Sequence, residues 1–174
     1  MHAVHENITI RNAEKADCAQ LAAWWNDGSV MAHAGFPMGL NTTEEKIAES
    51  ILTDTDNTRR RLILEYENAP IGEMSFRNIG SGSVEIGVKI CEKTHQEKGI
   101  GRKAVSLLIK TLFDMGFTKI VLDTNLKNTR AQHVYELLGF RKTGVRIDSW
   151  RDQMGNLQSA VDYELTQADF HSFI

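Results

Sequence analysis

Six residues near the middle of the chain, Gln96 to Gly101, have the composition of an anion-binding loop: Gln-Glu-Lys-Gly-Ile-Gly. They lie between an alternating segment typical of a strand and a long amphipathic segment typical of a helix. The first backbone N–H groups of a helix have no intrahelical partner, and the helix dipole places partial positive charge there. Glycines let a phosphate come close to these groups. The segment therefore predicts a pyrophosphate site.

The overall composition is that of an ordinary globular protein, and it excludes several classes of function. The 174 residues are expected to form one domain, 1–174, with a sizeable core. A net charge of -3 and the lack of a long basic run argue against nucleic acid as a partner. No apolar run is long enough to span a membrane, and the polar N-terminus lacks a secretory pattern. Cys18 and Cys91 lack metal-ligand spacing, so we expect no metal site and free thiols in a reducing cytoplasm.

Periodicity and turn residues predict a chain of alternating elements in the order βααβββαβαββ. The fold class is α/β (α+β), with a mixed, mostly antiparallel sheet of six to seven strands flanked by about four helices. Strands are expected over residues 8–11, 60–67, 71–78, 84–90, 118–123, 140–150 and 157–165, and helices over 13–25, 43–52, 100–115 and 128–138.

One alternative for the glycine loop is a dinucleotide site. Gly99-x-Gly101-x-x-Ala104 satisfies that fingerprint, and Asp123 follows 22 residues after Gly101. In that fold, however, the strand runs almost directly into the first glycine, whereas here residues 91–98 intervene. Only one further helix follows, too little for a full doubly wound sheet. This alternative predicts nicotinamide cofactor binding and no binding of coenzyme A (CoA).

Three motifs in order resemble those of the GNAT superfamily of N-acetyltransferases. Gln96-x-x-Gly99-x-Gly101 is similar to the acyl-CoA signature of that superfamily. Asn128-Thr129-Arg130-Ala131 then opens a helix, and Tyr135 through Gly139-Phe140 ends it, as in the superfamily. Trp24-Trp25-Asn26-Asp27 resembles the branch that holds ribosomal-protein N-terminal acetyltransferases. The core resemblance covers about residues 83–140.

The resemblance implies a cosubstrate, acetyl-CoA, and residues that bind it. Backbone amides from Glu97 to Arg102 would hold the pyrophosphate, with charge added by Lys98, Arg102 and Lys103. The pantetheine arm would pair with the edge of strand 84–90, so that N–H groups near Val88 or Ile90 face the thioester oxygen. Asn128 would contact the arm, act as a plain helix N-cap, or do both. The implied cofactor-binding residues are Val88, Ile90, Gln96, Glu97, Lys98, Gly99, Ile100, Gly101, Arg102 and Asn128.

Two catalytic roles follow from the same resemblance. Tyr135 matches the tyrosine that protonates the departing CoA thiolate; its spacing from Asn128 also permits a core aromatic. An amine must lose a proton before or during attack, and Glu85 is the first candidate for the general base. Glu73 is the second candidate, and ordered water is a third route. Either glutamate would otherwise be a cross-strand partner of a lysine or arginine.

The implied reaction transfers acetyl from acetyl-CoA to a primary amine of a small molecule or protein N-terminus by direct attack. The alternative is a CoA-binding regulatory module without catalysis. Acceptor specificity is expected in residues 28–40 and 151–156, walled by Trp24, Trp25, His33, Phe36, Met38 and Trp150. Three acids in or beside these regions, Asp27, Asp148 and Asp152, would attract a cationic acceptor. Exposed aromatics in the C-terminal hairpin favour a homodimer.

Overall fold

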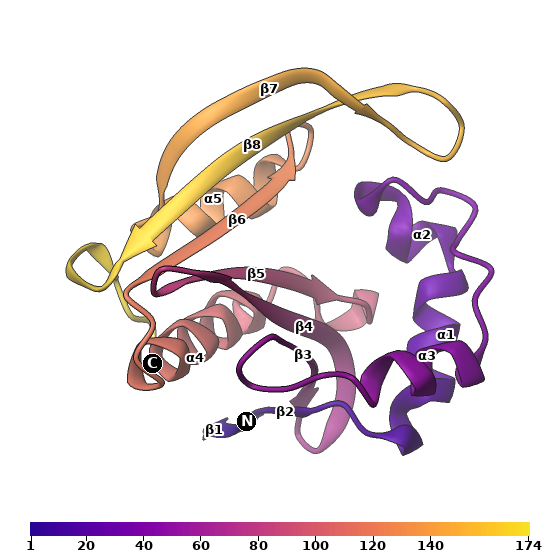
Figure 1. Ribbon diagram of the computed structural model, residues 1–174, viewed down its shortest axis with the longest axis horizontal. Helices are drawn as coiled ribbons and strands as arrows, with labels where there is room; N and C mark the ends of the chain where they lie inside the picture. Colours follow the sequence, from indigo (N-terminus) through magenta and orange to yellow (C-terminus); the bar gives the residue numbers. More distant parts are fainter.

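The structure, a computed structural model describing residues 1–174, is built on one eight-stranded mixed sheet. Its strands lie in the order β1-β2-β3-β4-β5-β6-β8-β7 (Figure 1). Only β5 and β6 are parallel, so antiparallel pairs dominate, as the turn signals predicted. The strands are β1 (His2–His5), β2 (Ile8–Asn12), β3 (Arg59–Tyr66), β4 (Ala69–Gly80), β5 (Ser83–Ile90), β6 (Lys119–Asn125), β7 (Arg141–Arg151) and β8 (Leu157–Thr166).

The parallel pair is short, and the two strands then separate. β5 and β6 are in register only at Ser83↔Lys119, Val84↔Ile120 and Glu85↔Val121. Beyond Glu85, β5 stays paired with β4 as far as Ile90, while β6 pairs with β8 as far as Asn125. Figure 1 shows the two strands diverging toward the end of the molecule where α2 lies. The sheet is thus split at its centre, which rules out the doubly wound architecture of the dinucleotide alternative.

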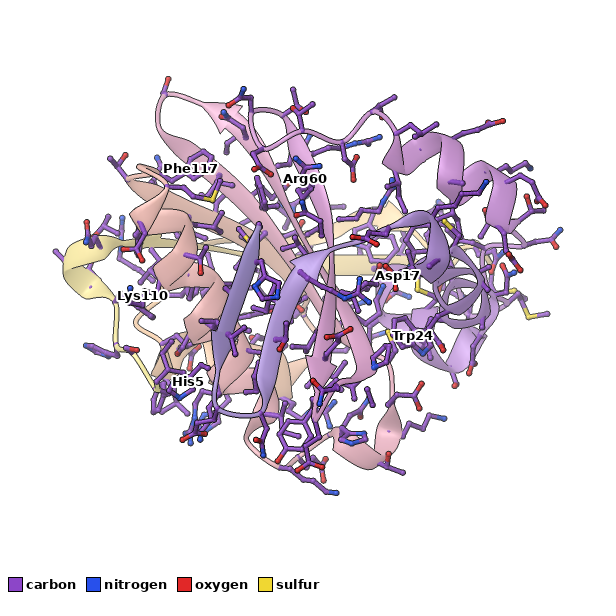
Figure 2. All side chains as sticks on the ribbon, turned by 90° about the horizontal axis from the view of Figure 1, so that it is seen from below. His5, Asp17, Trp24, Arg60, Lys110 and Phe117 are labelled. Carbon is purple, nitrogen blue, oxygen red and sulfur yellow. The ribbon has the colours of Figure 1, made fainter.

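Helices cover the two faces of the sheet unequally. α4 and α5 pack on one face, in a 25-residue apolar core that includes Leu108, Phe76 and Tyr163. α1 and α3 pack on part of the other face, in a smaller core around Trp24 and Ile63. Figure 2 shows α4, which carries Lys110, and α1, which carries Trp24, on opposite sides of the strands. The helices are α1 (Cys18–Asn26), α2 (Gly28–Met31), α3 (Glu44–Ile51), α4 (Ile100–Asp114) and α5 (Thr129–Leu137).

The sequence pattern of α4 explains its position. Ala104, Leu108 and Leu112 recur on one helical face and are fully buried, as their spacing predicted. Thr111 on the same stripe bonds its hydroxyl to the Leu107 carbonyl at 2.8 Å and is only half-buried. Gly116 ends the helix with φ +96°, a conformation that glycine adopts without strain. The apolar stripe therefore fixes α4 against the sheet and directs its N-terminus to the divergence of β5 and β6.

Several local expectations need correction. The sheet has one or two strands more than expected, because residues 2–5 pair with β2 across a tight turn. The first helix starts at Cys18 rather than Ala13, and it buries Trp24 more deeply than Trp25. The 28–40 segment contains the short helix α2 rather than loop alone. The exposed apolar side chains of the C-terminal hairpin are aliphatic rather than aromatic: Val145, Ile147, Met154 and Leu157.

Two further observations concern the chain as a whole. None of the helices has both the length and the apolarity needed to cross a membrane. Cys18 and Cys91 are free and buried, and burial raises the pKa of the Cys91 thiol to about 12. The thiols therefore stay protonated at neutral pH, and neither is disposed to act as a nucleophile.

We expect Leu108→Ala to lower the free energy of unfolding by about 2–5 kcal/mol, because it empties a fully buried site between α4 and the sheet. Urea unfolding followed by circular dichroism measures the change. The matched control is Lys110→Ala on the exposed face of α4, which loses one surface ion pair with Asp114 and should cost under about 1 kcal/mol. Equal losses in the two variants would contradict the packing described here.

Candidate functional site

The glycine loop opens α4 at the point predicted from the sequence. Gly99 is the N-cap residue, with φ +77° and open space around the position of a Cβ, and no side chain caps the helix. A Cβ on Gly101 would lie 3.0 Å from Ile90 Cδ1, so this glycine lets the first turn approach the end of β5. The first N–H groups of this 15-residue helix are therefore free for an anion, next to the strand divergence.

Side chains of the loop brace it rather than point into it. Gln96 Nε2 donates to the Ile90 carbonyl at 2.9 Å, and its Oε1 accepts from Arg130 Nη2 at 3.1 Å. Arg130 also pairs with Glu97 at 3.1 Å. The loop is thus tied to β5 on one side and α5 on the other. Sequence reasoning placed Gln96 and Glu97 at the cofactor; the structure gives their side chains internal partners and leaves their backbone available.

The inner edge of β5 presents unpaired backbone groups. The Cys91 N–H donates to Ile71 on β4, so by strand alternation the N–H groups of Ile90 and Val88 point away from β4. The Ile90 carbonyl accepts from Gln96 on that same side. Because β6 has already diverged, no strand occupies this edge. Val88 and Ile90 therefore lie where the sequence placed them, with N–H groups directed into the divergence.

The basic residues near the loop differ in their surroundings. Lys103 pairs with Glu6 at 2.7 Å. Arg102 stacks over the Phe173 ring at 4.1 Å, and its Nε is enclosed without a hydrogen-bond partner. Lys98 is exposed and has no ion-pair partner within the chain. Of the three, Lys98 has the freest charge at the start of α4.

Asn128 caps α5, as one of its two predicted roles requires. Its Oδ1 accepts from the Ala131 N–H at 3.2 Å. The cap begins α5 directly after the end of β6, so the helix starts beside the diverged strand. Contact with a cofactor arm stays a prediction.

Tyr135 projects from α5 into an aromatic cluster. Its ring lies 5.6 Å from that of Phe140 and 5.9 Å from that of Tyr163, and the residue is 8% exposed. Its hydroxyl makes no hydrogen bond within the chain and is not fully enclosed, so it reaches solvent. Burial, reinforced by the charge of Asp123, raises the pKa of Tyr135 to about 12. The phenol is therefore protonated at neutral pH.

The two predicted glutamate bases are both ion-paired. Glu85 accepts from Arg77 Nη2 at 2.6 Å on the neighbouring strand, with Glu85 40% exposed. Glu73 accepts from Lys89 Nζ at 2.9 Å, and that ammonium also lies 3.1 Å from the Met31 sulfur. The cross-strand pairing weighed as the alternative for each residue is thus present.

A carboxylate that sequence reasoning assigned only to the rejected dinucleotide fingerprint belongs to this site. Asp123 lies on β6 just past the last parallel pair, and its negative charge contributes to the raised pKa of Tyr135. Arg146 holds it at 2.6 Å and also pairs with Asp162 at 2.8 Å. Its alternation with buried Ile120 and Leu122 was the available signal, since it puts Asp123 on the sheet face opposite α4.

The two expected acceptor loops meet through Gln153. Its side chain accepts from the Met38 N–H at 2.9 Å and donates to the Gly39 carbonyl at 3.0 Å. Its backbone N–H donates to the Gly35 carbonyl at 2.8 Å. A Cβ on Gly35 would lie 2.4 Å from the Trp150 ring, so glycine is required at this contact. The β7–β8 hairpin therefore closes over the 28–40 segment, spanning the open end between β5 and β6.

Two of the acids expected to attract a cationic acceptor instead stabilise their own loops. Asp27 accepts from the Ser29 N–H at 2.7 Å and caps α2. Asp152 accepts from the N–H groups of Met154 and Asn156, both at 2.9 Å. Among the aromatics, Trp24 is buried and donates to Glu92 at 2.8 Å, so it does not wall a pocket.

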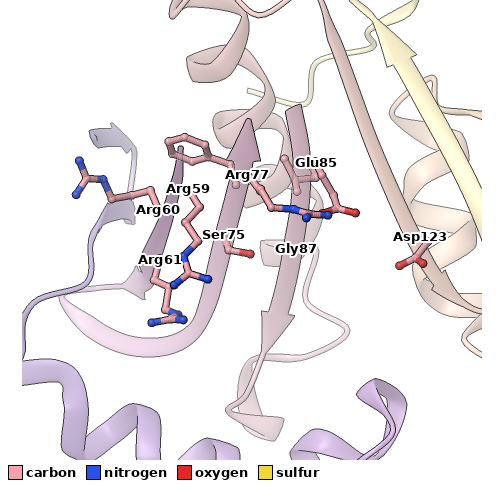
Figure 3. A pocket seen from close by; sticks show the side chains of 10 residues that line it. Arg59, Arg60, Arg61, Ser75, Arg77, Glu85, Gly87 and Asp123 are labelled. Carbon is pink, nitrogen blue, oxygen red and sulfur yellow. The ribbon is translucent and has the colours of Figure 1, made fainter. Parts of the chain in front are cut away.

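Two adjoining hollows lie on the uncovered face of the sheet and share Glu85 and Asp123. The larger, of about 380 Å³, extends over β3, β4 and β5 toward β6 (Figure 3). The smaller, of about 240 Å³, lies over β6 and β8. An acceptor in either hollow would thus lie beside both carboxylates.

Comparison with known proteins agrees with this geometry. Residues 7–141 match the Acetyltransferase (GNAT) domain family. The chain belongs to the GNAT acetyltransferases. Over 178 aligned residues it is 28% identical to the L-amino acid N-acyltransferase MnaT of Escherichia coli K12, covering 83% of this chain and 90% of MnaT. It is also 31% identical over 100 residues to MJ1062 of Methanocaldococcus jannaschii, of whose length it spans only 19%.

Solved GNAT structures share the fold at low sequence identity. Spermidine N-acetyltransferase from Vibrio cholerae, in complex with CoA and spermine, superposes with TM-score 0.82 at 22% identity, covering 95% of this chain and 98% of that one. RimL, a ribosomal L7/L12 alpha-N-protein acetyltransferase in complex with CoA, gives TM-score 0.83 at 16% identity, with 95% and 98% covered. The predicted fold class is confirmed.

We expect Tyr135 to make stability fall at high pH. Its pKa is about 12 in the folded state and about 10 when unfolded, so folding holds the proton more tightly. The resulting stabilisation is fully present below pH about 10 and is lost as pH rises toward about 12. Urea unfolding from pH 9 to 12 should show a shallower decline for Tyr135→Phe than for wild type. Parallel declines would contradict an enclosed phenol.

Removal of the Gln153 side chain should loosen the 28–40 segment without unfolding the domain. Gln153→Ala deletes two hydrogen bonds, so amide exchange at residues 36–40 should accelerate by about 5- to 100-fold. Hydrogen–deuterium exchange mass spectrometry measures this rate. Met154→Ala, in the same loop with a largely exposed side chain, serves as the control. An unchanged rate in Gln153→Ala would show that the two loops are not coupled.

Proposed function

We propose that this protein transfers an acetyl group from acetyl-CoA to a primary amine by direct attack in a ternary complex. One observation carries the proposal. The free N–H groups at the start of α4, the unpaired inner edge of β5 and the Tyr135 hydroxyl all lie around the divergence of β5 and β6. Each meets a separate need of acetyl transfer: docking the donor, orienting its thioester and protonating the leaving group.

The residues present fit acetyl-CoA. Open space at Gly99 and the uncapped N–H groups of α4 suit a pyrophosphate, with Lys98 adding positive charge. An extended pantetheine arm, which carries amide groups, can pair with the inner edge of β5 as an added strand would. The N–H groups of Val88 and Ile90 point toward that edge and can stabilise negative charge on the thioester oxygen. Asn128 lies at the start of α5, on the β6 side.

Tyr135 is the proposed general acid. As the amine forms its bond to the carbonyl carbon, the carbon–sulfur bond breaks, and the thiolate takes the phenolic proton. A pKa of about 12 keeps that proton in place until it is needed. The same enclosure raises the basicity of a thiolate formed beside the ring, since burial disfavours every charged form. The pKa of the phenol is thus better matched to that of a thiol inside the site than the pKa of a thiol in water indicates.

A carboxylate is the proposed acceptor of the amine proton. Glu85 remains the first candidate, and Asp123 joins it because it borders both hollows and is coupled to Tyr135. Glu73 is less suited, because its side chain is only 15% exposed and is engaged by Lys89. Two buried free thiols fit a reducing compartment such as the cytoplasm. The exposed edge strand β7, with Val145 and Ile147, would be the contact surface of a homodimer.

The test is amine-dependent release of CoA from acetyl-CoA, followed with a thiol reagent. Tyr135→Phe should lower kcat by about 10²- to 10⁴-fold, because proton transfer to the thiolate is lost. Its CoA affinity by calorimetry should stay at the wild-type value. Tyr66→Phe, which removes a hydroxyl from β3 at a residue with no role in the proposed proton transfer, is the control. CoA binding without release for any amine would indicate the regulatory module instead, and failure to bind CoA would refute the proposal.

The base is assigned by comparing Glu85→Gln with Asp123→Asn. Loss of the base should lower kcat by about 10²- to 10⁴-fold at neutral pH and recover partly at high pH, where more of the amine is already neutral. The other variant should change kcat less and lack that recovery. If kcat and its pH profile match wild type in both variants, ordered water rather than either carboxylate takes the proton.

A further inference from the structure

The larger hollow is strongly basic at one end. β3 and β4 supply four arginines to its lining, and Glu85 and Asp123 are the only acids there. Figure 3 shows Arg61 and Ser75 toward one side, the Arg77–Glu85 pair in the middle and Asp123 on the other side. The charge is thus unevenly distributed along the hollow, with cations over β3 and β4 and carboxylates where β5 and β6 diverge.

Three of the four arginines are neutralised by carboxylates of this chain. Arg59 pairs with Asp54 at 3.2 Å, Arg60 with Asp56 at 2.7 Å, and Arg77 with Glu85 at 2.6 Å. The fourth, Arg61, has no carboxylate within ion-pair distance, and its side chain makes no hydrogen bond. Arg61 is therefore the uncompensated cation of the hollow.

Arg61 is also held in place for binding. Its guanidinium carbon lies 5.4 Å from the centre of the Trp25 ring, within the range of a cation–π interaction. Its Nη1 is enclosed without a partner, so the cation is poorly solvated. Strand register places Ser75 opposite Arg61 and Gly87 opposite Ser75. The two small residues, Ser75 and Gly87, thus lead from Arg61 across the sheet to β5, two residues beyond Glu85.

The neighbouring hollow has the opposite sign. Its lining holds four carboxylates, those of Glu85, Asp123, Asp162 and Glu164, and one arginine, Arg146. Arg77 and Arg141, outside this lining, pair with Glu85 and Glu164. Because the two hollows share Glu85 and Asp123, the uncovered face of the sheet changes from basic to acidic across the point where the strands diverge. A molecule lying across that point meets a cation at one end and carboxylates at the other.

We propose that the acceptor is an amine that also carries a carboxylate, of the amino-acid class. This inference rests on the acetyl transfer proposed above and names its substrate class. The carboxylate lies toward Arg61 and the Ser75 hydroxyl, and the amine lies toward Glu85 and Asp123. A carboxylate offers Arg61 the charge partner that the chain does not supply. A polyamine offers none and would bring positive charge to the basic end of the hollow.

The experiment compares amino acids with their own carboxamides as acceptors. Leucine, methionine, phenylalanine and serine, each beside its amide, give pairs with the same side chain and amine; spermidine is added as a purely cationic amine. Initial rates of CoA release give kcat/KM for each. We expect every accepted amino acid to exceed its amide by about 10- to 100-fold, the range of a charge-assisted hydrogen bond.

Arg61 variants tie that preference to the hollow. Arg61→Gln should lower kcat/KM for the amino acids by about 10- to 100-fold and leave that for the amides within about 2-fold, whereas Arg61→Lys should recover part of the loss. Lys110→Gln, on the far face of α4, should match wild type. Thermal unfolding and CoA calorimetry of each variant show that the fold and the donor site persist.

Each contrary result has a distinct meaning. Amides or spermidine used as well as amino acids, or an acid preference that survives Arg61→Gln, would overturn this inference while acetyl transfer itself stands. No turnover with any amine, or no CoA binding, would overturn it together with the proposed function.

Discussion

The parallel pairing of β5 and β6 extends over three residue pairs and then stops, and the rest of the site depends on that limit. Each strand keeps its outer partner, so the sheet stays intact at both sides while its centre opens. Backbone groups at a sheet edge need partners, and an unpaired inner edge is costly unless something completes it. Gln96 satisfies one of these groups, the Ile90 carbonyl. The N–H groups of Val88 and Ile90 remain for a ligand that can bind as a strand does.

The uncovered face of the sheet shows how register places charge. Arg59 lies directly opposite Arg77, a like-charge pair that would by itself destabilise the sheet. Asp54 neutralises the first and Glu85 the second, so both can stay beside the divergence. Two residues further along the same strands, Arg61 faces Ser75 and has no carboxylate partner. Arg59 and Arg77 thus stabilise the sheet through their ion pairs, whereas Arg61 is available to a substrate.

Local signals in the sequence were sufficient for the elements and for the glycine loop. The glycines within residues 99–101 and the apolar stripe of α4 are local sequence patterns. The position of α4 at the end of a strand could therefore be predicted from them. The placement of Val88 and Ile90 at the cofactor came from the family resemblance, and their contact with a ligand stays a prediction. By contrast, the bond from Gln153 to Met38 and the contact between Arg61 and Trp25 each join segments far apart in sequence. Such contacts depend on strand order and register, which no local pattern encodes. The nearness of Asp123 to Tyr135 depends on them as well, although the alternation of Asp123 with Ile120 and Leu122 indicates which face of the sheet it occupies.

Hydrogen–deuterium exchange of the protein with and without CoA tests most directly whether the opened centre of the sheet is the donor site. We expect slower exchange at the amides of residues 88–90 and 98–102 when CoA is bound, because these groups then donate to the ligand. Amides on β1 and β2, at the outer edge of the sheet, should exchange at the same rate in both samples. If CoA binds without changing the exchange rates at residues 88–90 and 98–102, the opened centre of the sheet is not the donor site.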